Sequence, residues 1–131
     1  MKTRFIPVLV VLSVAMIGAI PLFAKRAAPK EVAAIEKDGI VYTAPQSNMG
    51  CVEARFKKTS GLFWKKQIYV VKYMMDLESD VQDCFIKELK FEAGKILVVN
   101  EAGYQYQLDP ESLEVTAAKG SLVIDRNKKE K

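Results

Sequence analysis

The sequence of 131 residues contains no histidine. Histidine is the most frequent general base in enzymes, and it completes the Ser-His-Asp and Cys-His nucleophile arrangements and most zinc sites. Its absence excludes sites of these kinds. We therefore expect no catalytic residue, no metal and no cofactor, although acids such as Asp80, Asp83 and Glu88 leave general acid–base chemistry as a weaker alternative.

A strong excess of charge is also missing. The chain has 20 basic and 16 acidic residues, a net charge of +4, and removing Lys2 and Arg4 with residues 1–24 leaves 18 and 16. A nucleic-acid-binding surface needs a basic stripe on one face. The balance predicts that nucleic acid is not a partner.

The first 24 residues differ in composition from the rest. Lys2 and Arg4 precede residues 5–24, which are apolar except for Ser13. This pattern is typical of a secretory signal peptide, but Leu22 occupies a position where a small residue is usual, and the run is long enough to span a bilayer. Two interpretations of this segment therefore remain: a signal peptide that is cleaved, and an uncleaved hydrophobic helix that contacts the membrane. Both predict export. A cleaved signal places the rest of the chain in the periplasm or outside the cell, whereas an uncleaved helix anchors it in the membrane.

Beyond residue 24 no long apolar run has a helical period, and period-2 alternation predominates. In residues 104–108 Tyr104, Tyr106 and Leu108 alternate with glutamines, which predicts a strand with one face in the core. Residues 96–99 form its hairpin partner. The other predicted strands cover 32–36, 40–44, 51–57, 62–74, 82–91 with a bulge near Lys87 and Glu88, 113–116 and 122–124. One helical turn at 32–35 is the alternative to the first of them.

These patterns predict an all-β fold of about eight short strands, arranged as hairpins and meanders in two blade-like sheets or a sandwich, after an N-terminal hydrophobic helix. The expected organisation is a signal or anchor at 1–24, a linker at 25–31, a β domain at 32–125 and a disordered basic tail at 126–131.

The β domain contains a weak internal duplication. Gly39 and Gly94 each open a hydrophobic strand and are 55 positions apart, while Gly50 and Gly103 are 53 apart. A fixed period of this size indicates a repeated sheet unit that must stack on its neighbour to bury its apolar face.

The two units resemble the repeats of quinoprotein-like (PQQ-like) β-propellers, whose pattern runs from Gly through a strand with a small residue to Asp, Thr-Gly and Trp. The matching residues are Gly50, Val52, Ala54, Thr59 and Trp64 in the first unit, and Gly103, Tyr106, Leu108, Asp109 and Ser112 in the second. The departures are Phe56 for Asp, Ser60 and Leu113 for Gly, Gln107 for the small residue, and the lack of a Trp in the second unit. Because propellers usually need four blades or more, the resemblance implies a two-unit relative, a sandwich of two small sheets, or half of a homo-oligomer. The family's cofactor ligands are not identifiable here.

Cys51 and Cys84 are the only cysteines. An even count in an exported chain indicates a disulfide, which would stabilise the fold by about 3–4 kcal/mol. Two buried thiols are the alternative, and the spacing disfavours a redox pair. We predict a structural bridge between the two units.

Three groups of side chains are candidates for binding. Aromatic residues form the first, because such residues dominate interaction hot spots, although they also serve as core: Phe63, Trp64, Tyr69, Tyr73, Tyr104 and Tyr106. Four lysines flank the turn before Trp64 and form a basic patch, which is either a set of solvated strand ends or a contact for an anionic lipid or glycan: Lys57, Lys58, Lys65 and Lys66. The acidic stretch of Asp76, Glu78, Asp80 and Asp83 is either a calcium loop or, as we favour, a solvated turn.

The sequence therefore predicts a small exported β-domain that binds an envelope protein and has no chemistry of its own. The alternative is a structural or accessory module of an envelope assembly, related to quinoprotein-like repeats.

Overall fold

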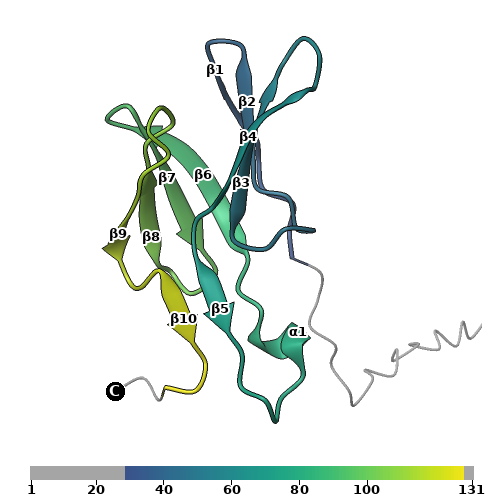
Figure 1. Cartoon of the computed structure of the whole chain (residues 1–131), viewed down its shortest axis with the longest axis vertical. Coiled ribbons are helices and arrows are strands. Elements are labelled where there is room, and N and C mark those ends of the chain that lie inside the picture. Colours follow the sequence, from purple (N-terminus) through teal and green to yellow (C-terminus); the bar gives the residue numbers. More distant parts are fainter. Residues whose placement is uncertain (1–28, 129–131) are drawn as a thin grey trace, which may run out of the picture.

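The computed structural model describes residues 29–128 and is all-β, with ten strands in three sheets and one short helix (Figure 1). The all-β prediction is confirmed, with two more strands than expected. The predicted hydrophobic helix at 1–24 lies outside the described residues. Within residues 29–128 no helix has the length and apolar character needed to cross a membrane.

The first sheet is an antiparallel meander with the order β1-β2-β3-β4. Its strands are β1 (Ile35–Lys37), β2 (Ile40–Thr43), β3 (Cys51–Phe56) and β4 (Leu62–Gln67). The predicted strands in this region are confirmed for 40–44 and 51–57, whereas the strand at 32–36 begins later. Both β1 and β4 are edge strands of this sheet.

The second sheet repeats the same meander with the order β6-β7-β8-β9. Its strands are β6 (Ile86–Glu92), β7 (Lys95–Asn100), β8 (Gln105–Leu108) and β9 (Val115–Lys119). Beta-branched and aromatic residues dominate its centre, where the predicted hairpin of β7 and β8 is confirmed.

The bulge predicted near Lys87 and Glu88 is also present. The register between β6 and β7 shifts between Ile86 and Glu88. One extra residue restores the alternation, so Ile86 and Leu89 are both buried.

A third element joins the two meanders. Strand β5 (Val70–Lys72) follows the first sheet, β10 (Val123–Asp125) follows the second, and they pair in parallel. Between β5 and the second sheet lies α1 (Ser79–Gln82), a single turn. Residues 62–74, predicted as one strand, therefore divide between two sheets, because Ile68 and Tyr69 enter the core between β4 and β5.

The internal duplication is visible in the backbone. Ser60 and Leu113, 53 positions apart, have φ angles of 59° and 61°. The N–H of Ser60 donates to the carbonyl of Phe56 at 2.8 Å, and the N–H of Leu113 donates to that of Asp109 at 2.8 Å. Left-handed backbone is unfavourable for these residue types, so its recurrence at equivalent positions marks two copies of one turn.

The first hairpin turn of each unit also has the same backbone conformation in both copies. Asp38 and Gly39 have φ angles of 53° and 78°, and Ala93 and Gly94 have 50° and 78°. Two consecutive positive φ values define a tight hairpin turn whose twist suits the flanking strands. Both turns lie at the same end of the molecule (Figure 1).

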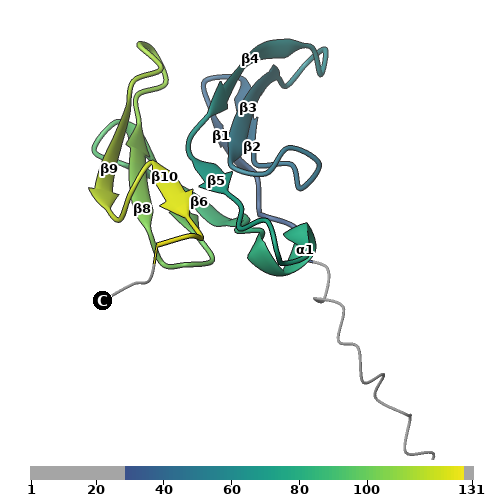
Figure 2. The ribbon, with the colours of Figure 1, turned by 60° about the horizontal axis from the view of Figure 1, so that its bottom comes forward.

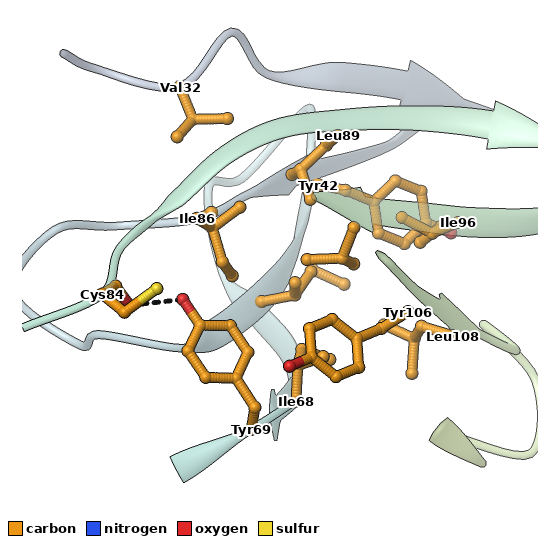
Figure 3. Close-up of a cluster of buried hydrophobic side chains, with 14 of the residues drawn as sticks. Val32, Tyr42, Ile68, Tyr69, Cys84, Ile86, Leu89, Ile96, Tyr106 and Leu108 are labelled. Carbon is orange, nitrogen blue, oxygen red and sulfur yellow. Dashed lines mark hydrogen bonds between the residues drawn. The ribbon is translucent and has the colours of Figure 1, made fainter. Parts of the chain in front are cut away.

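The two sheets face each other, with β5 and β10 between them at one end (Figure 2). Their inner faces form one hydrophobic core. It includes Val32, Tyr42, Ala44, Val52, Ala54, Ile68, Tyr69, Cys84, Ile86, Leu89, Ile96, Val98, Tyr106, Leu108 and Ile124 (Figure 3).

The predicted disulfide between Cys51 and Cys84 is wrong, because both cysteines are free, buried and not close together. The thiol of Cys51 donates to Oε1 of Gln67 at 2.9 Å across the first sheet. The thiol of Cys84 instead lies beside the backbone N–H groups of Glu101 and Ala102. Each sulfur thus has its own local partner.

Candidate binding cleft

A cleft of about 550 Å³ opens between the two sheets at the end that carries the turns of Asp38 and Ala93. We define the cleft by its main lining residues, which are Ile40, Tyr42, Phe63, Trp64, Phe91 and Leu113. Its volume lies in the range of small-molecule and peptide-side-chain pockets.

Aromatic rings form the floor of the cleft. The ring centroid of Tyr42 lies 5.7 Å from that of Trp64 and 5.6 Å from that of Phe91. The planes of Tyr42 and Phe91 meet at 83°, an edge-to-face arrangement. Strands β2, β4 and β6 supply these three rings, so both sheets contribute. Tilted and edge-to-face arrangements are the ones that aromatic rings prefer, so these contacts stabilise the floor of the cleft.

The indole of Trp64 is a polar group without an internal role. Its Nε1 is buried and has no hydrogen-bond acceptor among residues 29–128. A buried tryptophan N–H usually finds a partner, because leaving it unpaired costs free energy. Beside an open cleft, such a donor is suited to a ligand carbonyl after a small adjustment of the ring.

Charged residues form the rim. Lys37, Asp38, Lys95, Asp109 and Glu111 also line the cleft, and the Nζ of Lys37 lies 5.6 Å from the ring centroid of Phe91. Hydrogen bonds from the backbone N–H groups of Glu111 and Ser112 lower the pKa of Asp109. The rim therefore offers both signs of charge around an apolar floor.

The six aromatic residues predicted for binding do not share one surface. Phe63 and Trp64 line the cleft. Tyr69 and Tyr106 are buried in the core, where their rings stack. Tyr73 donates to Asp83 far from the cleft, and Tyr104 packs on Gly120 beside a second, more polar hollow with Arg126.

Sequence reasoning missed four residues of the cleft, namely Ile40, Tyr42, Phe91 and Leu113. Each resembles an ordinary core position of a strand or turn in the sequence. The available signal was the duplication, because Ile40 and Tyr42 follow the first hairpin turn while Phe91 precedes the equivalent turn of the second unit.

The acidic candidates do not converge. Asp83 accepts a hydrogen bond from Tyr73 at 2.5 Å, Asp80 lies in α1, and Glu88 is exposed on β6. Among the described residues no group of three or more acidic or cysteine side chains is placed to hold a metal ion. The acidic stretch therefore provides no assembled site in residues 29–128.

Comparison with known proteins adds no identification. No model of a known protein family matches the sequence, and no curated protein matches it. The function of the chain is therefore inferred from the geometry of the cleft.

Proposed function

We propose that this chain is an exported, non-catalytic binding module that takes an apolar segment of an envelope protein in the cleft. The single observation that carries the proposal is the aromatic floor between the two sheets, where the ring of Tyr42 contacts both Trp64 and Phe91. Aromatic side chains in a concave, partly desolvated setting are typical of interaction hot spots.

The rim supports a peptide rather than a purely apolar ligand. Lys37 and Lys95 lie near Asp38 and Asp109 around the same opening. Such a rim can pair with the charged residues that flank an apolar segment, and the unpaired N–H of Trp64 can donate to a peptide carbonyl. Export is supported by the signal-like or anchor-like residues 1–24.

Site-specific photo-cross-linking in the native host tests this function. A photoreactive phenylalanine analogue replaces Phe91 in the cleft or, as a control of similar chemistry, Tyr73 at the other end of the molecule. We expect one discrete envelope protein to be captured from position 91 and not from position 73.

A second variant shows whether the captured protein uses the cleft. Leu113→Asn removes an apolar wall but keeps a residue type that tolerates the φ of 61° found there. We expect this variant to lose the adduct and to weaken binding of the purified partner about tenfold. Equal capture from both positions, or capture that Leu113→Asn leaves unchanged, would contradict the proposal.

The alternative function is an accessory module related to quinoprotein-like repeats, and the duplicated turns of Ser60 and Leu113 favour it. Two chains would supply the four units that a closed propeller usually needs. Sedimentation equilibrium tests this alternative. A stable dimer would support it. A chain that stays monomeric at concentrations about 100-fold above a micromolar Kd, the value typical of a weak assembly, would argue against it.

A further inference from the structure

We infer that the turn joining β3 to β4, with the last residue of β3 and the whole of β4, binds the surface of a bilayer that contains anionic phospholipid. We name this segment, residues 56–67, the tip hairpin. It projects from the body at the top right of Figure 1. The tip hairpin shares Phe63 and Trp64 with the cleft, but the inference goes beyond the proposed function, because it concerns a lipid surface and not the protein partner of the cleft.

The apolar part of the tip hairpin is exposed. Phe56, Leu62 and Phe63 expose 41%, 51% and 54% of their surfaces, and the rings of Phe56 and Phe63 lie 5.1 Å apart. Large apolar side chains that gather on an exposed turn mark an interaction surface more often than single exposed residues do.

The turn is structured although it is exposed. The N–H of Phe56 donates to the carbonyl of Gly61 at 2.9 Å, and the N–H of Ser60 donates back to Phe56 at 2.8 Å. The guanidinium of Arg55 also donates to the carbonyl of Ser60 at 3.1 Å. These contacts keep the apolar side chains at the tip, so membrane contact needs little rearrangement.

The charge of the tip hairpin selects the partner. Residues 56–67 contain four lysines and no acidic residue. Lys57 is paired with Glu36 at 2.9 Å, whereas Lys58, Lys65 and Lys66 have no ion pair among the described residues. Lysines around an apolar tip match a surface of anionic headgroups over hydrocarbon, and each contributes about fivefold to the affinity.

A second exposed apolar region differs from the tip hairpin in the charge of its neighbours, and this charge determines whether an anionic bilayer attracts it. Met75 and Leu77 expose 98% and 54% of their surfaces, but the same loop carries Asp76 and Glu78, and Asp80 follows in α1. An anionic bilayer repels such a loop. Leu77 therefore matches Phe63 in exposure and differs from it in electrostatic setting.

The full chain can be tested in vesicles because Trp64 is its only tryptophan and adjoins Phe63. Vesicles of phosphatidylcholine with 30% phosphatidylglycerol and brominated acyl chains quench a tryptophan that lies at the bilayer. We expect the fluorescence of Trp64 to be quenched by these vesicles. The quenching should be much weaker with vesicles of pure phosphatidylcholine or in 0.5 M salt. Contact made only through residues 5–24 would leave Trp64 unquenched, which would overturn the inference.

Variants assign the contact to residues. Lys58→Gln/Lys65→Gln should lower the equilibrium constant for quenching about 25-fold, and Phe63→Ser about tenfold. The matched controls Lys87→Gln/Lys90→Gln and Leu77→Ser should change it less than twofold. Equal loss in controls and tip variants would contradict the inference, as would quenching that persists in the lysine variant.

The cleft variant separates this inference from the proposed function. Leu113→Asn should lose the partner and keep quenching by anionic vesicles. A tip hairpin that binds a protein or a nucleic acid instead would leave Trp64 unaffected by vesicles in every variant, and that result would overturn the lipid assignment alone.

Discussion

The rings of Tyr69 and Tyr106 stack in the core with centroids 5.2 Å apart and planes inclined by 15° (Figure 3). Tyr69 belongs to the first unit and Tyr106 to the second. The hydroxyl of Tyr69 donates to the carbonyl of Cys84 at 2.5 Å, and that of Tyr106 donates to the carbonyl of Ser121 at 2.6 Å. The stacked pair therefore joins both units and the segments that follow them.

Removing the hydroxyl of Tyr69 should destabilise the fold. Tyr69→Phe leaves the buried carbonyl of Cys84 without this donor, which costs about 1–3 kcal/mol. Urea unfolding followed by circular dichroism measures the change. Tyr73→Phe is the control, because Tyr73 is partly exposed and water can replace its contact with Asp83; an equal loss in both variants would contradict the prediction.

Gly50 should not tolerate a side chain. Its φ is +74°, and a Cβ there would lie 2.6 Å from the carbonyl oxygen of Tyr69. Gly39 has a φ of +78° but nothing within 4 Å, so Gly39→Ala isolates the backbone strain of about 1 kcal/mol. We expect Gly50→Ala to lower the free energy of unfolding by at least about 1–2 kcal/mol more than Gly39→Ala does. Similar losses in the two variants would show that the close approach does not matter.

Both thiols should be free and slow to react. Burial raises the pKa of Cys51 and of Cys84, so little reactive thiolate forms at neutral pH. In a thiol titration without reductant, the native protein should react slowly, and the unfolded protein should show two thiols per chain. Fewer than two thiols after unfolding would show that the cysteines are not both free.

Stability should fall in alkaline solution. Burial raises the pKa of Tyr106 to about 12 and also raises the pKa of Tyr69, whereas a tyrosine in an unfolded chain ionises near pH 10. Between these values the unfolded state releases protons that the folded state keeps, so the free energy of unfolding decreases as pH rises. Urea midpoints at pH 8, 9.5 and 11 should show this decrease. The double variant Tyr69→Phe/Tyr106→Phe should show a shallower decrease, and an unchanged slope would contradict the assignment.

Local patterns were sufficient to predict most strands. The alternation of Tyr106 and Leu108 with glutamines, next to a turn at Gly103, defined the central hairpin of the second sheet. The irregular spacing around Lys87 likewise revealed the bulge. In these places the apolar period and the turn residues predict the same local structure that the tertiary contacts require.

Other features depend on contacts between distant residues. No glycine or proline separates Gln67 from Val70, so nothing local indicates that the chain leaves one sheet for another there. The backbone turns because Ile68 and Tyr69 are drawn into the core that both units share.

The candidate site illustrates the same limit. A sequence distinguishes neither a core aromatic such as Tyr106 from a cleft aromatic such as Phe91, nor two separately buried thiols from a bridge. Each of these distinctions depends on which strands face each other. The duplication was visible in the sequence, but the cleft between its two copies was not.

The parallel pairing of β5 with β10 also has a consequence for folding during synthesis. Val70 leaves the ribosome 53 residues before its partner Val123. The sequence separation of this pair is large, so β5 stays unpaired until residue 123 has emerged. Nascent chains that stop before Val123 would present an open strand to chaperones and proteases, and synthesis of β10 ends this exposure.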